Sequence, residues 1–242
     1  MYAIQTIDLV KRYKNIYAVD GLNLEIKKGE IFALLGLNGA GKTTTIKMLS
    51  CVTVPTEGEV LINGYSTAKD PEVVKRLIGV SPQNTAIAPN LTVKENLEFI
   101  CGINRFSKEK TNAKVLELSE KFNLENVLKR KAGHLSGGWQ RRVSIAMALI
   151  SEPEIIFLDE PTLGLDVIAR RELWDIIKSL KGSVTIVLTT HYMEEAETLS
   201  SRIGVMKNGR LLSVGTAEEL KIRYNANNFE NAFISIVKGE GI

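Results

Sequence analysis

The chain has little cysteine, no long hydrophobic run and almost no excess charge. Its two cysteines, Cys51 and Cys101, fit no metal or redox spacing, so we interpret both as buried thiols in a reducing compartment. No apolar stretch approaches the roughly 20 residues that span a bilayer, and the N-terminus lacks the continuous apolar core of a signal peptide. We therefore expect a protein that is soluble or that reaches a membrane through a partner.

The weak charge excess also argues against one large class of partner. The sequence has 31 basic and 28 acidic residues, which gives a net charge of +3 and no ground for expecting nucleic acid. Hydrophobic residues make up 44% and charged residues 24% of the 242 positions, as in ordinary globular proteins with a sizeable core. This length fits one large α/β domain or two small ones.

Short apolar segments alternate with segments of helical pattern. Alternation at Ala3–Val10 and Leu22–Ile26 predicts antiparallel strands, and Asn63-Gly64 and Asn208-Gly209 predict hairpins. Further strands are predicted at Ile31–Leu35, Leu77–Val80, Ile155–Leu158, Val184–Thr189, Ile203–Met206 and Leu211–Val214, and helices at Lys42–Cys51, Val93–Cys101, Lys108–Phe122, Gly138–Ile150 and Ala169–Leu180. This alternation implies an α/β fold with a mostly parallel sheet, an inserted helical part and, from about residue 225, a short separate tail.

A glycine-rich segment, Gly36–Thr43, follows a buried strand and precedes a helix. Its pattern of glycine, four residues and Gly-Lys-Thr is that of a phosphate-binding loop. Glycines let backbone N–H groups surround an anion, and the helix N-terminus adds its positive end. Lys42 would bind the β- and γ-phosphates, the Thr43 hydroxyl suits Mg²⁺, and Thr44 would reach the α-phosphate. We therefore expect ATP and Mg²⁺ as ligands.

Two carboxylates, Asp159 and Glu160, end a buried apolar strand. Ligands bind at the carboxyl ends of parallel strands, so this is a favourable place for chemistry. Asp159 would hold the magnesium, and Glu160 would orient or deprotonate the attacking water. Taken alone, the pair also fits a solvated acidic turn before Pro161; the phosphate loop favours the catalytic interpretation.

A second anion site is indicated by Leu135-Ser136-Gly137-Gly138, which precedes a helix. Ser136 lies where a helix N-cap would lie, so a hydroxyl, glycine N–H groups and a helix dipole meet there. One chain then carries two phosphate sites. If one ATP occupies both kinds of site, the second must come from another subunit.

In this order, the motifs resemble the nucleotide-binding domain of ATP-binding cassette (ABC) proteins, and the resemblance covers nearly the whole chain. Residues 36–44 resemble the Walker A motif, Gln83 the Q-loop glutamine, 135–140 the signature, 155–160 Walker B, 164–166 the D-loop and His191 the switch histidine. Tyr13 is placed like the aromatic residue that stacks on adenine, with Tyr17 a nearby competitor. Each minor motif alone also fits an ordinary loop or strand position, and their joint order favours the functional interpretation.

The resemblance implies a P-loop NTPase (RecA-like) core with an N-terminal antiparallel β-subdomain at residues 1–86 and 151–224, an inserted helical subdomain at 87–150 and a C-terminal tail at 225–242. It implies catalytic roles for Glu160, His191, Gln83 and Lys42, and Mg²⁺ ligation by Thr43, Gln83 and Asp159. The implied nucleotide contacts are Tyr13, Val19, Gly36, Leu37, Asn38, Gly39, Ala40, Gly41, Lys42, Thr43, Thr44, Ser136, Gly137, Gly138 and Asp166.

The resemblance further implies a head-to-tail dimer with ATP between the copies. The partner is a second copy or a related cassette, and Ser136 and Gly138 of one subunit grip the γ-phosphate held by the other. Asp166 would help to transmit the state of the site across the dimer. One departure is Trp139, where the family usually has Gln or a flexible residue. Its indole would pack against the partner or the helical subdomain.

The implied function is an ATPase that drives transport. Separate integral membrane permease subunits would bind the cargo, which the cassette does not contact, and would hold the chain at the cytoplasmic face of the membrane. Residues 161–166 and 170–174 and the ending Phe229–Phe233 resemble ABC-2 type exporters of drugs, lipids and polysaccharides. An importer cassette remains the alternative, and the ending also fits an ordinary amphipathic tail. A non-transport ABC ATPase of DNA repair or translation is a further alternative, but those carry a long coiled coil or two cassettes.

Overall fold

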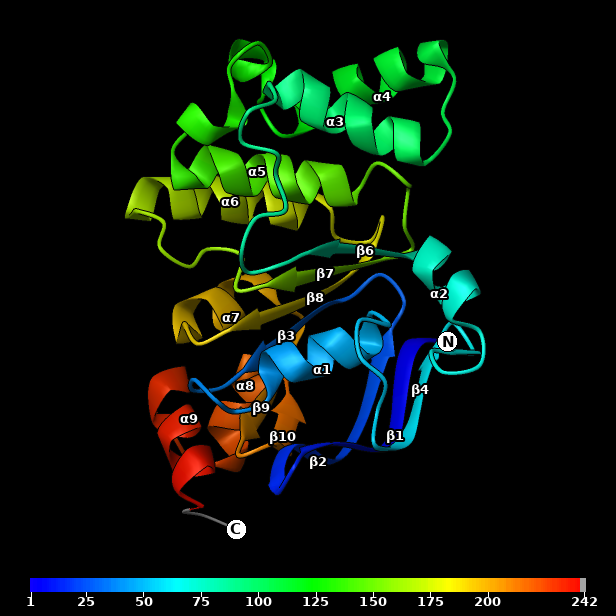
Figure 1. Ribbon diagram of the computed structural model, residues 1–242. Coiled ribbons are helices and arrows are strands. Elements are labelled where there is room, and N and C mark those ends of the chain that lie inside the picture. The colour runs from blue at the N-terminus through cyan, green and yellow to red at the C-terminus, as the bar shows by residue number, and fades with distance from the viewer. Residues whose placement is uncertain (240–242) are drawn as a thin grey trace.

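The computed structural model describes residues 1–239, whose strands form two sheets. The smaller sheet is antiparallel and has the order β2-β1-β4-β5 (Figure 1). Its strands are β1 (Tyr2–Tyr13), β2 (Ile16–Lys27), β4 (Glu57–Ile62) and β5 (Tyr65–Ser66). The predicted N-terminal antiparallel β-subdomain is therefore confirmed, with the Asn63-Gly64 turn joining β4 to β5.

The larger sheet has the order β10-β9-β3-β8-β7-β6. Its strands are β3 (Ile31–Leu35), β6 (Ile78–Ser81), β7 (Ile155–Asp159), β8 (Thr185–Thr190), β9 (Arg202–Lys207) and β10 (Arg210–Gly215). Neighbours from β9 to β6 run parallel, and β10 is antiparallel at the edge. The carboxyl ends of the parallel strands therefore meet along one side of the sheet, where such sheets bind ligands.

The central strand β3 is buried on both faces, which explains its uninterrupted apolar sequence. Ile31, Ala33 and Leu35 belong to one apolar cluster, whereas Phe32 and Leu34 belong to another. Successive side chains of a strand point to opposite faces, so β3 contributes to both clusters. The second cluster fills the space between the two sheets around α1 (Lys42–Leu49), which contacts strands of both.

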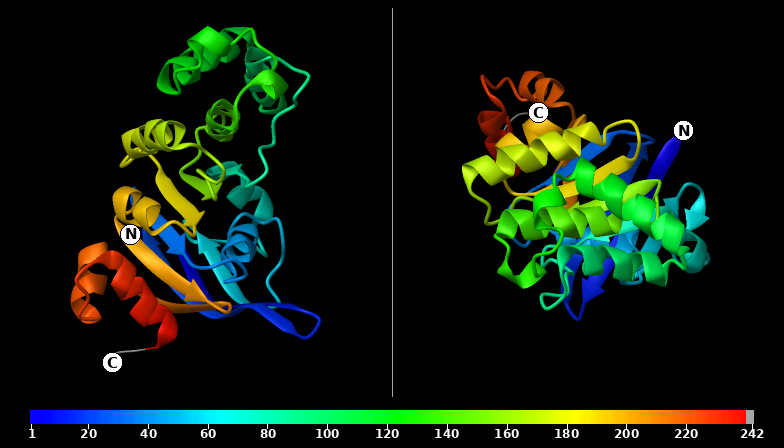
Figure 2. Two further views of the ribbon diagram at one scale, coloured as in Figure 1. Left: turned by 90° about the vertical axis from the view of Figure 1, so that its left-hand side faces the viewer. Right: turned by 90° about the horizontal axis from the view of Figure 1, so that it is seen from above.

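Most of the helices cover the β6 edge of the larger sheet and the face that points away from the smaller sheet. Figures 1 and 2 show α3 (Val93–Ile103), α4 (Lys108–Lys121) and α5 (Gly137–Ala148) at one end of an elongated molecule, with α6 (Val167–Ser179) beside α5. Short 3₁₀ turns at Glu125–Val127 and Ala132–His134 connect α4 to α5. This is the inserted helical part that the sequence predicted; its exact limits at 87 and 150 remain a prediction.

Three helices of seven residues each escaped the sequence analysis: α2 (Pro71–Leu77), α7 (Met193–Leu199) and α8 (Ala217–Arg223). Two turns of helix are too short for a 3.6-residue period to be recognised against the background of apolar residues. Local capping is the better signal, since Thr216 and Glu219 form a capping box at the start of α8.

The C-terminal stretch is not a separate tail. Residues Phe229–Lys238 form α9, which packs on α8 and β9, and its buried apolar residues belong to the same cluster as the larger sheet. Phe229, Ala232, Phe233 and Ile236 recur at the spacing of one helix face, and that face needs a partner to bury it. The expectation of a separate tail is therefore wrong for these residues. Residues 240–242 of that expected tail lie outside the described part.

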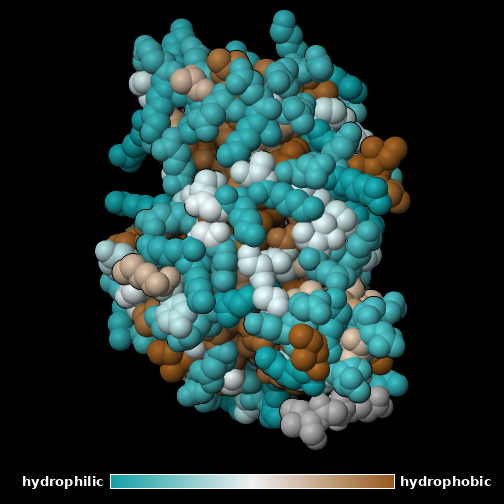
Figure 3. All heavy atoms as spheres, turned by 180° about the vertical axis from the view of Figure 1, so that it is seen from behind, coloured by the Kyte–Doolittle hydropathy of each residue, from teal (hydrophilic) through white to brown (hydrophobic). Residues whose placement is uncertain are grey.

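Within residues 1–239, no helix combines the length and the apolar composition needed to cross a membrane. The face seen in Figure 3 is mostly hydrophilic, with apolar side chains scattered between charged and polar ones.

Candidate functional site

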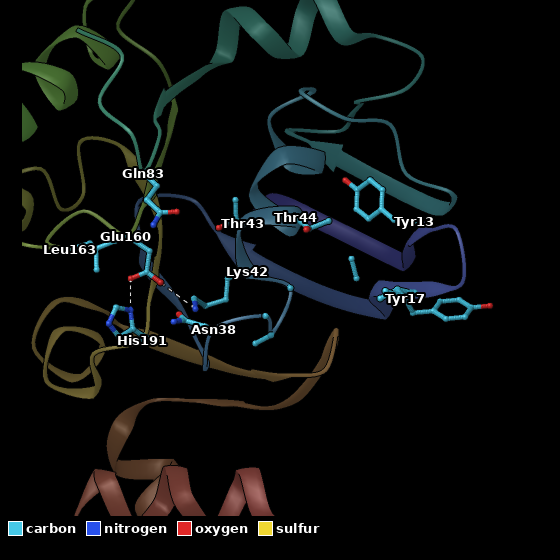
Figure 4. A pocket seen from close by; sticks show the side chains of 15 residues that line it. Tyr13, Tyr17, Asn38, Lys42, Thr43, Thr44, Gln83, Glu160, Leu163 and His191 are labelled. Atoms are coloured by element: carbon cyan, nitrogen blue, oxygen red, sulfur yellow. Dashed lines mark hydrogen bonds and ion pairs between the residues drawn. The ribbon is translucent and has the colours of Figure 1, made fainter. Parts of the chain in front are cut away.

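A cavity of about 620 Å³ opens beside the carboxyl ends of β3, β7 and β8. It is lined by Tyr13, Ile16, Tyr17, Ala18, Asn38, Gly39, Ala40, Gly41, Lys42, Thr43, Thr44, Gln83, Glu160, Leu163 and His191. Parallel strands bring together the loops that follow them, so side chains distant in sequence converge here. Figure 4 shows this convergence around Lys42 and Glu160.

The loop from β3 to α1 follows a path that requires glycine. Gly39 and Gly41 have φ angles of 80° and 103°, in the left-handed region that side chains disfavour. A Cβ on Gly41 would lie 2.4 Å from the carbonyl oxygen of Ala18, and one on Gly36 would lie 2.5 Å from that of Met206. The loop is thus seated directly on the backbone of β2 and β9, and α1 begins at its exit. This is the cradle that a phosphate needs, with the positive end of a helix beside it.

Lys42 and Glu160 form a buried ion pair in this cavity. Nζ of Lys42 lies 3.2 Å from Oε1 of Glu160, and their side chains are only 6% and 7% exposed. The same Nζ donates to the carbonyl oxygen of Gly36 at 2.7 Å. On the other side, Nδ1 of His191 lies 2.8 Å from Oε2 of Glu160. The structure therefore brings three predicted catalytic groups into one contiguous set, with the Glu160 carboxylate between the other two (Figure 4).

The backbone of Glu160 is held in an unusual conformation. Its φ of 48° lies in the left-handed region, which costs a residue with a side chain about 1–3 kcal/mol. The N–H of Glu160 donates to the hydroxyl of Thr189 at 3.0 Å, and this buried contact helps to hold the bend. The sharp turn after β7 directs the carboxylate into the cavity toward Lys42.

Oxygen atoms suited to magnesium lie at the same edge of the sheet. The Thr43 hydroxyl donates to Oδ1 of Asp159 at 3.1 Å, and the Thr189 hydroxyl donates to the same oxygen at 2.5 Å. Mg²⁺ prefers such oxygen donors and takes one or two protein ligands besides phosphate and water. Residues 1–239 contain no group of three or more His, Cys, Asp or Glu that could hold a metal alone. The hydroxyl of Thr43 and the carboxylate of Asp159 are oxygen donors of the kind that Mg²⁺ prefers.

The predicted adenine side requires one correction. Tyr13 and Tyr17 are each 49% exposed and border the cavity. In Figure 4, Tyr13 lies beyond Thr44 and Tyr17 points away from the loop. Val19, expected at the nucleotide, is instead fully buried between the sheets, and its neighbour Ala18 lines the cavity. Adjacent residues of a strand face opposite sides, which explains the exchange.

The serine-glycine segment lies outside this cavity. Ser136 is the N-cap residue of α5, as the pattern predicts, yet its side chain is exposed and makes no capping hydrogen bond. Gly137 is exposed as well, whereas Gly138 is buried so close to α6 that a Cβ would lie 3.0 Å from that of Ala169. The two predicted anion sites are therefore separate within one chain.

Two further signature and D-loop residues make contacts within the chain. The carboxylate of Asp166 caps α6, accepting from the N–H groups of Ile168 and Ala169 at 3.0 and 2.9 Å. Trp139 packs against the main apolar cluster, and the guanidinium of Arg142 lies 4.6 Å from its ring centroid. Its indole thus has partners within its own helix and core.

Sequence reasoning missed Thr189 and Arg141. Thr189 is paired with Asp159 across β7 and β8, a neighbourhood that only the sheet order reveals. Arg141 holds the backbone at Gln83 with two hydrogen bonds. The available signal for Thr189 was its place at a strand end, two residues before the switch histidine. No comparable signal in the sequence pointed to Arg141.

The comparison with known families decides the identity. The family described as ABC transporter matches residues 19–163, which is more than half of the chain. The chain belongs to the ABC transporter family.

Similar ABC proteins support this assignment. The chain is 40% identical to a daunorubicin resistance ATP-binding protein of Streptomyces coeruleorubidus, over 87% of this chain and 67% of that protein. It is 38% identical to a probable multidrug ABC transporter ATP-binding protein of Escherichia coli, over 97% of this chain but only 41% of that protein. The chain thus spans about two thirds or less of these relatives.

A solved structure gives the same answer. A dimeric ATP-binding cassette in a post-hydrolysis state, bound to ADP and Pi, superimposes with a TM-score of 0.79 at 34% identity, covering 88% of this chain and 98% of that one. The family, the fold class and the ATPase class predicted from the motifs are thereby confirmed. The roles of individual site residues remain predictions.

Proposed function

We propose that this ABC cassette binds ATP·Mg²⁺ at the interface of a dimer, hydrolyses it, and so drives membrane permease subunits in the direction of export. The observation that carries the proposal is the convergence of Lys42, Glu160 and His191 at the glycine cradle. The open helix end at Ser136 supports the dimer, because it is an anion site that its own chain leaves without a ligand.

The polar residues at the phosphate end of the cavity divide the chemical tasks between them. The glycine loop and Lys42 bind the phosphates, and Glu160 accepts the proton of the attacking water. His191 holds the Glu160 carboxylate in place and contacts the γ-phosphate. Thr43, Asp159 and Gln83 would hold Mg²⁺, which supplies neutralisation of the charge on the β- and γ-phosphate oxygens.

The dimer follows from the position of the second anion site. Ser136 and the glycines after it would bind the γ-phosphate held by the other copy, whether that copy is identical or a related cassette. Once the γ-phosphate has been cleaved and released, this contact disappears and the halves separate. The dimeric cassette bound to ADP and Pi is a precedent for such an arrangement.

Export by separate permease subunits is the finer part of the proposal. Its support is the naming of similar proteins for daunorubicin resistance and multidrug transport. A permease would dock near the loop after Gln83 and α3, where Phe99 and Ile103 expose apolar side chains one helical turn apart. The cassette would then work at the cytoplasmic face of the membrane, with no role for nucleic acid.

The ATPase assignment is tested by Glu160→Gln. The variant keeps the shape of the side chain but loses the base, so turnover should fall by about 10²–10⁴-fold while ATP binding persists. Light scattering after gel filtration with Mg²⁺ and ATP should show a dimer. Full ATPase activity in the variant would contradict the role of Glu160.

The transport assignment is tested by affinity purification from membranes of the native host. A co-purifying integral membrane protein of several spans is the expected result, and vesicles containing both should move cargo out of the compartment that holds ATP. Recovery with ribosomes or DNA, or ATP-driven movement in the opposite direction, would contradict this part.

A further inference from the structure

Helix α5 contacts β6 and the loop after it at successive turns. A Cβ on Gly79 would lie 2.2 Å from the carbonyl oxygen of Ala148, so helix and strand are in close contact at this point. One turn earlier in the helix, the hydroxyls of Ser144 and Ser81 lie 2.9 Å apart and are buried. These helix residues lie on one face, and the next position on that face is Arg141.

The guanidinium of Arg141 grips the loop by two carbonyl groups. Nη1 donates to the carbonyl oxygen of Pro82 at 2.6 Å, and Nη2 donates to that of Gln83 at 2.7 Å. A guanidinium presents its N–H groups in a rigid planar fork, so two such bonds fix both the position and the orientation of the peptide that they hold. The side chain of Gln83 remains exposed and lines the cavity.

The energetics of Arg141 indicate a task other than stabilising the fold. Its side chain is 5% exposed, and it takes part in no ion pair among residues 1–239. Burial lowers the pKa of its guanidinium, which Asp159 and Glu195 oppose from a distance. Burying a cation without a carboxylate partner is unfavourable, and the hydrogen bonds to two backbone carbonyls are the compensation that this site provides.

We propose that Arg141 is a positioning residue for Gln83: it fixes the backbone of the loop so that the glutamine amide reaches Mg²⁺ and the γ-phosphate. This inference rests on the proposed function, in which Gln83 contacts the metal. Arg141 also lies in α5, five residues after the N-cap residue Ser136. The same fork therefore ties the loop of one active site to the helix end that would grip the nucleotide of the partner.

The test is the Mg²⁺ dependence of Arg141→Met in the purified full chain. Outer partners of metal ligands typically affect metal affinity 10- to 100-fold, so the Mg²⁺ concentration for half-maximal ATPase activity should rise by about tenfold or more. A fluorescent ATP analogue should bind equally to variant and wild type in EDTA, and added MgCl₂ should improve its affinity less in the variant. Hydrogen exchange of segment 82–90 should become faster.

Arg142→Met is the matched control, because Arg142 is the next residue, is equally buried, and pairs with Glu172 rather than with the loop. It should lower the melting temperature without changing the Mg²⁺ requirement. Equal Mg²⁺ shifts in the two variants, or none in Arg141→Met, would overturn the inference. Should Arg141→Met fail to fold, Arg141→Gln takes its place under the same criteria, since its shorter amide cannot make the fork.

Gln83→Ala separates this inference from the proposed function. If Gln83→Ala leaves the Mg²⁺ dependence unchanged, the metal contact assigned to Gln83 is wrong. If it raises the Mg²⁺ requirement while Arg141→Met does not, the metal contact stands and the role of Arg141 is wrong.

Discussion

Two helix N-termini of this cassette are suited to phosphate, and they differ in what the rest of the chain provides for them. At the start of α1, Lys42 is buried, pairs with Glu160 and lies in a formed cavity. At the start of α5, Ser136 is exposed and makes no capping hydrogen bond. The first end is complete within one molecule, whereas the second offers its groups outward.

This difference separates two binding events: nucleotide binding at α1 and dimerisation at α5. A phosphate at α1 enters a site whose groups are already fixed by neighbours, so binding there needs no second protein. In the dimer that we propose, the phosphate at α5 belongs to the nucleotide of the other copy. Nucleotide binding and dimerisation should therefore be separable by mutation, and the predictions below test that separation.

The largest effect is expected from Lys42→Met. The variant loses a charged donor to the phosphates and leaves the Glu160 carboxylate buried without its ion-pair partner. A hydrogen bond to a charged group contributes about 1.5–3 kcal/mol, so ATP affinity should fall roughly 10- to 150-fold. Titration with a fluorescent ATP analogue measures this. An unchanged affinity would show that the cradle of α1 is not the primary nucleotide site.

Ser136→Ala should weaken the dimer and leave ATP binding unchanged. Its monomer should bind ATP as the wild type does, because the serine lies outside the cavity. The ATP-dependent dimer should weaken by about tenfold or more, for want of a donor to the γ-phosphate of the partner. Analytical ultracentrifugation with non-hydrolysable ATP measures it.

Ser107→Ala is the control for that variant, since Ser107 is also an exposed N-cap serine, at α4. It should cost about 1 kcal/mol of stability and leave the dimer unchanged. If both serine variants affect the dimer alike, the two helix ends differ less than we infer.

Thr189→Val tests how the phosphate site at the start of α1 is held in place by its neighbours. The buried hydroxyl bonds both Asp159 and the N–H of Glu160, and its loss removes one hydrogen bond from each group, at about 0.5–1.5 kcal/mol per bond. The melting temperature should fall by several degrees, and kcat should fall with it. Thr185→Val loses a hydrogen bond at the other end of β8, with the N–H of Gly29, and should lower only the melting temperature. Equal kcat values in the two variants would count against Thr189.

The smallest effect is expected from Glu195, a buried carboxyl group that holds Thr162 and Trp174 in place. Desolvation raises the pKa of Glu195, whose Oε1 accepts from the Thr162 hydroxyl at 2.7 Å and the Trp174 indole at 3.1 Å. The folded chain thus binds this proton more tightly than the unfolded chain does. Stability is lost as pH rises from the unfolded pKa, near 4.3, toward the raised folded value.

Glu195→Gln keeps an oxygen acceptor but does not titrate. Its melting temperature should therefore gain on the wild type between pH 5 and pH 8. Glu194→Gln, at the exposed neighbouring position, should run parallel to the wild type. A difference between Glu195→Gln and wild type that stays constant with pH would contradict the raised pKa.

Local spacing was enough to predict the parts of the site that lie within one loop. The path of Gly36–Thr43 and the acidic end of β7 are written in consecutive residues, and so is the N-cap at Ser136. The alternation of strands with helices likewise predicted the parallel sheet, because the parallel order requires helical connections.

The contacts that the sequence could not predict join segments that become neighbours only in the folded chain. The contact of Thr189 with Asp159 needs β8 beside β7, and that of Arg141 needs α5 beside β6. The prediction that Val19 contacts the nucleotide missed by one position. Neighbouring residues of a strand face opposite sides, so Val19 lies in the core while Ala18 faces the cavity. The apolar face of α9 was visible in the sequence, but its target on β9 was not.

The pairing of Lys42 with Glu160 sets an order of events. Within this buried pair each charge neutralises the other, so the ammonium and the carboxylate are both already engaged. A γ-phosphate carries more negative charge than one carboxylate and competes for the lysine. In the function that we propose, this competition would free the Glu160 carboxylate when the nucleotide binds, so the substrate would itself prepare the base that its hydrolysis requires.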